Sequence, residues 1–171
     1  MKDNSEIIHE TTVKSFAWKR HLIFFLILIS LIAGAVLRSS IATRHDSFTI
    51  DEAYHIGAGV AYVKTGDFRL NPEHPPFVKL WVGAFVSGIY QLSPYRAFQD
   101  KYDERGFTET DVFLRNDPDH IQRRARLAMF ALNGLLLLLF ALAARYAIND
   151  IAALAAVAFL QLTRQSTRIC Q

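Results

Sequence analysis

Cysteine is nearly absent from this sequence, which has a single one, Cys170. Because a disulfide needs two cysteines, the chain can form no internal disulfide. A large excess of charge of one sign is also lacking: 19 Lys and Arg stand against 16 Asp and Glu, a net charge of +3. So small a net charge, with basic residues beside apolar runs and not along one polar face, argues against binding to nucleic acid.

Apolar residues are what the sequence has in excess, at 51% of its 171 residues. That length is typical of one domain, but two long apolar runs in such a composition are typical of a membrane protein and argue against a water-soluble core. Basic residues flank the runs, at Lys19, Arg20, Arg38 and 123–126. We therefore predict an all-α integral membrane protein.

The first apolar run, residues 22–37, reads LIFFLILISLIAGAVL. With Trp18 at its head, where an interfacial aromatic fits, it approaches the ~20 residues that cross a bilayer. Residues 1–21 are polar and mixed in charge, and we expect a cytoplasmic tail without a packed element. A cleaved signal peptide is the alternative, because residues 33–35 resemble a cleavage site. The long polar region ahead and the continuation of the run favour a retained transmembrane helix.

The second apolar run, residues 127–144, would measure ~27 Å as a helix, the thickness of a hydrocarbon core. Its helix is predicted to start early, with Asp117 as N-cap, Pro118 at the first helical position and Asp119 in the first turn. The same three residues spell the D-x-D pattern of some metal-dependent sugar transferases. Helix capping is the simpler explanation of that pattern.

A third apolar stretch, residues 151–162, is too short to cross a membrane and is followed by the polar string 163–171. We expect an incomplete third transmembrane helix at the end of a truncated or frame-shifted reading frame. Because the first helix usually dominates orientation and long loops translocate despite their charges, we expect the N-terminus inside. Residues 38–126 then form an extracytoplasmic loop of a multi-pass protein of the plasma membrane.

Two segments of this loop have helical periodicity. The first, at about 51–65, is followed by Gly66, where a helix end favours a left-handed residue. The second, at about 76–92, follows two prolines and places Lys79 on its polar side. Its apolar core is short for a crossing, so we predict amphipathic helices in the loop, the second lying on the membrane surface. A true third crossing is the alternative for the second segment.

The stretch from residue 51 to 83, DEAYHIGAGVAYVKTGDFRLNPEHPPFVKLWVG, lies between the two crossings and carries a family resemblance. Together with the layout of residues 18 to about 160, it resembles the GT-C glycosyltransferases that use polyprenyl-phosphate sugars, such as protein O-mannosyltransferases and bacterial aminoarabinose transferases. The resemblance covers only the start of such an enzyme. Further crossings, a second acidic loop and a soluble C-terminal domain have no counterpart, so we expect this chain to be inactive by itself.

The resemblance implies transfer of a sugar from a polyprenyl-phosphate donor to a hydroxyl acceptor on a lipid, glycan or protein, with inversion. Asp51 and Glu52 are then the candidate catalytic residues, Asp51 as the base that accepts the hydroxyl proton. A positioned base contributes roughly 10² to 10⁴ in rate, and burial beside lipid would raise the pKa of the Asp51 carboxyl. Because neighbours on a helix point ~100° apart, we expect Glu52 to support or cap the helix. Acids at a helix start are also favoured by capping alone.

Candidates for binding the leaving phosphate are Arg69, His74 and Lys79, because a preorganised cation stabilises the charge that develops there. His55 lies four residues after Asp51 on the same face, where it could hold the aspartate or contribute to a metal site that needs further ligands. Each candidate also has a purely structural interpretation, as a contact with lipid headgroups, a helix cap or part of a polar helix face. A divalent metal is therefore a possible cofactor, and none is firmly implied.

Two other functions fit the same sequence. A small membrane protein whose outer loop binds a partner or ligand would need no chemistry. A polyprenyl carrier or flippase component would bind membrane lipid but would need no base at Asp51. The residues name neither the sugar nor the acceptor.

Overall fold

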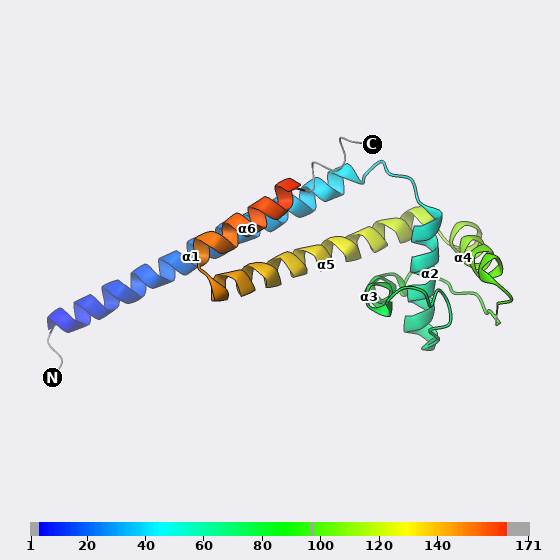
Figure 1. Cartoon of the computed structure of the whole chain (residues 1–171), viewed down its shortest axis with the longest axis horizontal. Coiled ribbons are helices and arrows are strands. Elements are labelled where there is room, and N and C mark those ends of the chain that lie inside the picture. Colours follow the sequence, from blue (N-terminus) through cyan, green and yellow to red (C-terminus); the bar gives the residue numbers. More distant parts are fainter. Residues whose placement is uncertain (1–3, 97, 164–171) are drawn as a thin grey trace. The chain divides into compact units, whose positions relative to one another are not determined.

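The structure, a computed structural model, describes the backbone of residues 4–96 and 98–163 and the side chains of residues 18–49, 51–96 and 98–161. Over these ranges all regular elements are helices, as predicted (Figure 1). They are α1 (Asn4–Ala42), α2 (Ile50–Thr65), α3 (Pro76–Val86), α4 (Lys101–Arg115), α5 (Pro118–Ala147) and α6 (Asp150–Thr163). The chain divides into an apolar unit, Met1–Ile41 with Asn133–Gln171, and a loop unit, Ala42–Leu132.

Two helices are long and apolar enough to cross a membrane, Trp18–Ala42 within α1 and Pro118–Ala147. They contain the predicted spans 22–37 and 127–144. Only 11% and 17% of their most apolar windows are buried, respectively. The core helix of a soluble protein would be mostly buried, whereas most of the apolar side chains in these two windows are not covered by the rest of the chain.

The helix α1 begins at Asn4, well before the first predicted span at residue 22. The sequence of residues 1–21 has no apolar periodicity and did not predict this helical extension. Extending an existing helix avoids the cost of nucleating a new one, so a polar segment can continue a long apolar helix without apolar periodicity of its own. At the other end α6 covers the third apolar stretch, and residues 164–171 lie outside the described residues.

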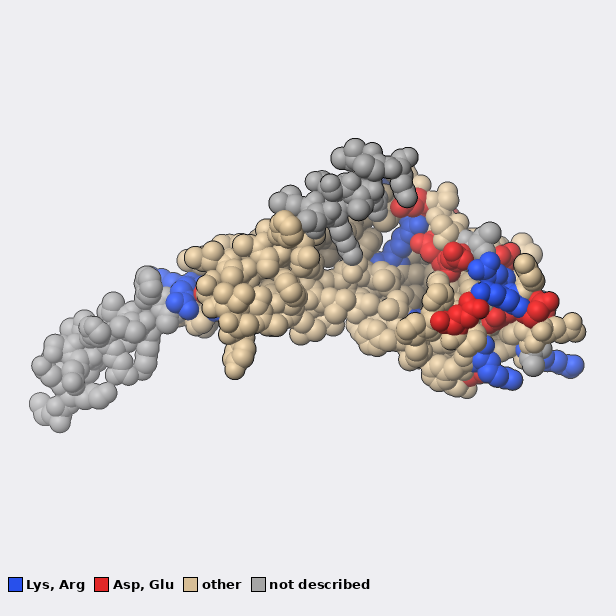
Figure 2. Space-filling view, in the orientation of Figure 1, with Lys and Arg blue, Asp and Glu red and all other residues tan. Residues whose placement is uncertain are grey.

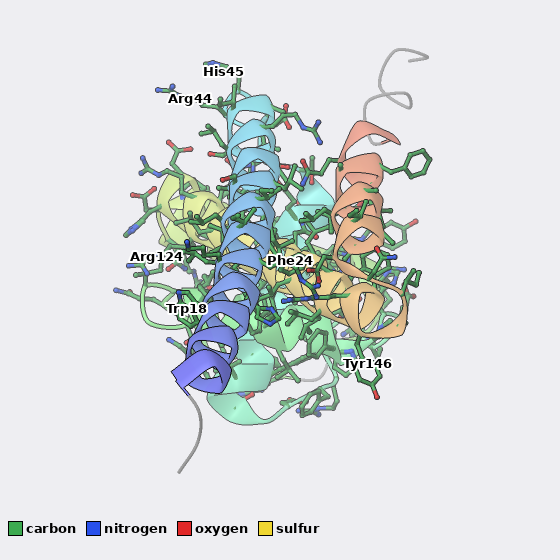
Figure 3. All side chains as sticks on the ribbon, turned by 90° about the vertical axis from the view of Figure 1, so that its left-hand side faces the viewer. Trp18, Phe24, Arg44, His45, Arg124 and Tyr146 are labelled. Atoms are coloured by element: carbon green, nitrogen blue, oxygen red, sulfur yellow. The ribbon has the colours of Figure 1, made fainter. Side chains whose placement is uncertain are left out.

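The interior of the apolar unit is small and is formed by α1, the second half of α5, and α6. Phe24 and Leu28 are buried against Ala141, Ala153 and Val157. Phe24 points toward the neighbouring helices, whereas Trp18 lies on the outer side of α1 (Figure 3). Small residues on α5 and α6 let the helices approach the aromatic ring of α1.

Charged residues join the three helices of the apolar unit at one end. The Arg145 guanidinium contacts the Asp150 carboxylate at 2.7 Å and lies 4.1 Å from the centre of the Phe24 ring. Arg20 reaches the same carboxylate at 3.1 Å. Asn149 caps α6 by accepting a hydrogen bond from the Ala152 amide at 2.8 Å. These contacts fix the short α5–α6 connection.

In the loop unit α2 lies between α3 and α4 (Figure 1). It ends as predicted at Gly66, whose φ of 68° is left-handed. We expected an amphipathic helix, but residues 53–62 are all buried except the half-buried His55. The reason is that α3 and α4 cover two different sides of α2. The helix α2, which carries Asp51 in its first turn, is thus the central element of its unit.

The helix α3 ends at Val86, six residues before the predicted end. Ser87 follows as the C-cap, and Gly88, a poor helix former, stands next in the turn. Its 11 residues span ~16 Å, too short for the third crossing that was the alternative. At its centre α3 crosses α2 so closely that a Cβ on Gly83 would lie 2.1 Å from the Gly59 carbonyl oxygen. Only glycines permit this backbone approach.

The helix α4 was not predicted. Asp100 caps it by accepting hydrogen bonds from the Tyr102 and Asp103 amides at 2.8 and 2.9 Å. Its buried face is largely polar, with Glu104, Thr108 and Asp111 beside Val112. A search for apolar periodicity therefore finds no helix. Acidic and basic side chains gather over the loop unit, whereas little charge shows on the coloured surface of α1, α5 and α6 (Figure 2).

Candidate functional site

A pocket of about 540 Å³ opens in the loop unit between the start of α2, the turn before α3, α3 itself and the first half of α5. Its polar lining consists of Thr49, Asp51, Glu52, His55, His74, Lys79, Gln122 and Arg126. Its apolar lining includes Ile56, Pro75, Val78, Val82, Ala125 and Met129. Five of the six residues predicted from the sequence thus lie around one cavity, and Arg69 does not.

Glu52 caps α2 and ties it to α5. The Thr49 hydroxyl accepts a hydrogen bond from the Glu52 amide at 3.2 Å, and the Glu52 carboxylate accepts one from the Thr49 amide at the same distance. The carboxylate also accepts a hydrogen bond from Gln122 at 3.3 Å and lies 3.7 Å from the Arg126 guanidinium. The predicted capping role of Glu52 is confirmed, with the added link across the pocket.

Asp51 lies at the pocket mouth, where its side chain is 74% exposed. Its carboxylate faces the Arg105 guanidinium of α4 at 3.4 Å. We expected burial to be the main influence on this group, but the protein itself leaves it accessible. The reason is its place in the first turn of α2, two residues before the buried part of the helix that α3 and α4 cover. An accessible carboxylate can meet a hydroxyl acceptor without a rearrangement of the chain.

His55 is oriented by Asn71 and not by the aspartate. The Asn71 side-chain nitrogen lies 2.8 Å from Nδ1 of His55. With the amide nitrogen as donor, Nδ1 accepts, which leaves the ring proton on Nε2. Burial lowers the pKa of His55, and the nearby His74 and Lys79 lower it further. The ring is therefore neutral at pH 7 and can offer one N–H to a ligand.

His74 lies beside His55, with ring centres 5.1 Å apart in an edge-on arrangement. The two imidazoles come from different elements, α2 and the turn before α3, and both line the pocket. Sequence spacing alone could not bring them together. The left-handed Asn71, at φ 53°, turns the chain back toward α2 and so places the second imidazole near the first.

Lys79 lies on the buried side of α3 and not on an exposed polar side. It is 3% exposed, and its ammonium donates hydrogen bonds to the His74 carbonyl at 3.0 Å, to the Asn71 carbonyl, and to the Tyr62 hydroxyl at 3.4 Å. Burial lowers its pKa. We expected Lys79 on the polar side of a surface helix, but α3 turns that side toward α2. An ammonium has three protons, and here all three have protein acceptors.

Arg69 is separated from the pocket. Its guanidinium donates hydrogen bonds of 2.9 and 2.6 Å to the two oxygens of the Asp67 carboxylate, and 71% of the Arg69 side chain is exposed. Hydrogen bonds from Arg69 lower the pKa of Asp67 to about 2. The pair stabilises the bend after Gly66. The structure therefore does not join Arg69 to the other phosphate-binding candidates.

Two important residues of this region were not predicted from the sequence as members of the site, Asn71 and Arg126. Asn71 is fully buried, and its amide donates a hydrogen bond to the Glu104 carboxylate of α4. Arg126 donates to the Thr43 carbonyl at 2.5 Å and to the Asp46 carbonyl at 3.2 Å, which holds the chain ahead of α2. The run of arginines was noted only as a membrane flank. A left-handed Asn before Pro is a turn signal that could have identified Asn71.

A divalent metal finds no ready site. Among the described residues, no group of three or more His, Cys, Asp or Glu side chains is placed to hold one.

Comparisons of the chain with protein-family models, with curated proteins and with solved structures found no match. Its function is therefore argued from the residues of the pocket.

Proposed function

We propose that this chain takes part in sugar transfer from a polyprenyl-phosphate donor to a hydroxyl acceptor at a membrane surface, in the manner of the GT-C enzymes it resembles. One observation carries the proposal: a single pocket has carboxylate, imidazole and guanidinium groups beside an apolar wall. A polyprenyl-phosphate sugar has the matching chemistry, an anionic and hydroxylated head on an apolar chain. Few ligands need all of these surfaces together.

The proposal includes membrane insertion through α1 and α5, with the loop unit outside the plasma membrane. It is supported by the low burial of the apolar windows in both helices. Uncovered leucine, isoleucine and phenylalanine side chains are stable against lipid and costly in water. The position of Trp18 on the outer side of α1 agrees with an interfacial aromatic (Figure 3).

In the proposed reaction the acceptor oxygen attacks the anomeric carbon from the face opposite the phosphate. Asp51 accepts the hydroxyl proton as the new C–O bond forms. The bond between the anomeric carbon and the phosphate oxygen breaks, and its electron pair leaves with the polyprenyl phosphate. The configuration is thereby inverted. Asp51 suits this role because its carboxylate is accessible at the mouth of the pocket.

The phosphate-binding role moves from Lys79 and Arg69 to other groups. His55 can donate its Nε2–H and His74 lies beside it, while Arg126 adds a guanidinium on the α5 side of the pocket. Lys79 instead holds the turn that carries His74. A neutral imidazole donor stabilises a developing charge without needing to be protonated itself.

The test uses the full chain in bilayer membranes with a photoactivatable polyprenyl-phosphate sugar. We expect crosslinks on α3 and α5 residues of the pocket in this chain. Because the chain is expected to be inactive by itself, transfer of labelled sugar to an alcohol acceptor is measured after the chain has been extended by the further crossings that the resemblance implies. Asp51→Asn should lower transfer by roughly 10² or more while crosslinking persists. Asp67→Asn is the matched control, because Asp67 is also an arginine-paired aspartate of the loop unit but lies outside the pocket. Equal transfer by both variants would refute the base.

Orientation is tested separately. In a Cys170→Ser background, Tyr102→Cys places the only thiol at a residue that is 85% exposed. We expect an impermeant maleimide to label it from outside intact cells. Labelling only after the cytoplasmic side is opened would contradict the proposed topology.

A second candidate function is ligand binding by the loop unit without catalysis. It is favoured by the contact of Asp51 with Arg105, an ion pair that could hold the carboxylate for structure alone. Crosslinking to the pocket with no sugar transfer by the chain extended with the further crossings would support this function over the first.

A further inference from the structure

The apolar unit has a groove of its own, about 420 Å³ in volume, between α1, the second half of α5, and α6. Its polar lining residues are Arg38, Ser39, Asn133 and Gln161, and its apolar lining residues are Ala35, Leu136, Leu137, Phe140 and Leu160. The groove belongs to neither role proposed for the loop unit. Two of the helices that line it, α1 and α5, are long and apolar enough to cross a membrane.

Polarity is graded along this groove. Arg38 stands one turn before the end of α1 at Ala42, whereas Phe140 belongs to the same stretch of α5 as Ala141, which packs with Phe24 and Leu28. A Cβ on Gly134 would lie 3.5 Å from Ile32. The start of the second half of α5 therefore lies beside the last third of α1. The polar end therefore lies near the end of a membrane span and the apolar end lies deeper.

Arg38 is the one ionisable side chain in the lining of this groove. It donates a hydrogen bond to the Gln161 carbonyl at 2.7 Å, and the Gln161 amide donates to the Leu31 carbonyl at 3.0 Å. Over the described side chains, no carboxylate forms an ion pair with Arg38. A guanidinium has five N–H donors, and among the described residues Gln161 takes one of them, so further donors can meet a ligand. A half-buried arginine at membrane level is costly unless an anion accompanies it.

We propose that this groove binds an anionic phospholipid of the surrounding bilayer, with its phosphate on Arg38 and an acyl chain along Leu136, Leu137 and Phe140. Charge complementarity selects the occupant, because the lining offers one cation and no anion. The order of polar and apolar residues matches the order of headgroup and chain from the interface inward. The site rests on the membrane insertion of α1 and α5 proposed above, and it is independent of sugar transfer.

The test is native mass spectrometry of the detergent-solubilised full chain with equimolar phosphatidylglycerol and phosphatidylcholine. We expect a preference for phosphatidylglycerol, which Arg38→Gln should lower about fivefold, the factor expected for one cation near an anionic headgroup. Arg38→Lys, which keeps the charge, should retain most of the preference. Arg44→Gln is the matched control, because Arg44 is exposed beyond the end of α1 and outside the groove.

A second variant tests the groove and not the charge. Ala35→Leu narrows the apolar part while leaving Arg38 in place, and it should also lower phosphatidylglycerol binding. Three outcomes would overturn the proposal: equal binding of the two lipids, an equal loss in Arg44→Gln, or displacement of phosphatidylglycerol by equimolar polyprenyl phosphate. Resistance of the chain to carbonate extraction, measured in parallel, separates loss of the lipid site from failure of membrane insertion.

Discussion

The two units of this chain differ in how far their apolar side chains are buried. In the apolar unit the helices expose most of their leucine, isoleucine and phenylalanine side chains and share a small interior around Phe24 and Leu28. In the loop unit an apolar cluster around Val60, Val86 and Tyr90 is buried, and polar groups such as Asn71 are buried with it. The first arrangement belongs to helices that are long and apolar enough to cross a membrane, whereas the second holds together by its own contacts.

Glycine shows the same contrast. A Cβ on Gly34 of α1 would meet nothing within 4 Å, and one on Gly134 would make ordinary contact with Ile32 at 3.5 Å. In the loop unit a Cβ on Gly59 would lie 2.2 Å from the Lys79 carbonyl oxygen. Close backbone contact thus requires glycine at position 59 of the loop unit, whereas Gly34 and Gly134 of the apolar unit make no such contact. A glycine-to-alanine substitution should therefore affect the two units differently.

The largest effect is expected for Gly59→Ala. The added methyl group would collide with the backbone of α3, and α3 would have to move away from α2. Overpacking of this kind costs about 3 kcal/mol at the upper end of its usual range. In a Trp18→Phe background Trp81 is the only tryptophan, and its indole donates to the Ala128 carbonyl at 2.7 Å. Thermal unfolding followed by its fluorescence therefore reports on the loop unit.

The control for this prediction is Gly34→Ala in the same background. Alanine is a better helix former than glycine by about 1 kcal/mol, so the change should leave unfolding unaltered or slightly later. Equal destabilisation by both variants would show that the two units do not differ in packing as the structure indicates.

The contrast also explains what could be predicted from sequence. The two long apolar helices follow from composition and length, and the ends of α2 and α5 follow from residues with local roles, such as Gly66 and Pro118. These signals act within one turn of helix. They require no knowledge of which element packs against which.

The missed features all depend on contacts between elements. The helix α4 buries Glu104 and Asp111, so its buried face is largely polar and apolar residues alone do not reveal which side packs. Lys79 was placed on a polar surface because lysine is rarely buried, yet its ammonium reaches two carbonyl groups of the preceding turn. Arg105 came to face Asp51 only through the packing of α4 on α2. Such partners are far apart in sequence and leave no local pattern.

Lys79→Met should give the second largest effect. Methionine keeps much of the stem but leaves the His74 carbonyl, and part of the Asn71 carbonyl, without a donor. An unsatisfied buried polar group costs about 2 kcal/mol. Arg69→Ala is the comparison, because it removes an exposed cation of the same unit and should shift the Trp81 unfolding curve much less. A larger shift for Arg69→Ala would contradict the assignment of Lys79 as the structural cation.

His55 should make the loop unit less stable in acid. Its pKa is lowered in the folded chain, chiefly by burial. The unfolded chain, with the ordinary value of 6.5, therefore binds the proton more readily, and stability falls as the pH drops below about 6.5 until the folded pKa is passed. The charged or titratable groups that act on the ring are Asp51, His74, Lys79 and Arg105.

The measurement is a titration of the His55 ring by NMR together with unfolding at several pH values. His55→Gln should flatten the loss of stability below pH 6.5, whereas His45→Gln, which changes an exposed histidine outside the pocket, should leave it in place. If the His55 ring titrated above 6.5, the predicted loss of stability in acid would be contradicted. The assignment of the ring as a neutral N–H donor would be contradicted as well.

The smallest effect on stability should come from Asp51→Asn, the change expected to affect transfer most. The carboxylate is 74% exposed and its contact with Arg105 is 3.4 Å long, so the ion pair is screened by water. Such pairs contribute less than about 1 kcal/mol, and α2 keeps its cap because Thr49 and Glu52 are unchanged. The Trp81 unfolding curve should therefore overlay that of the parent. Marked destabilisation would mean that Asp51 supports the fold, and any loss of transfer in that variant could then no longer be assigned to a missing base.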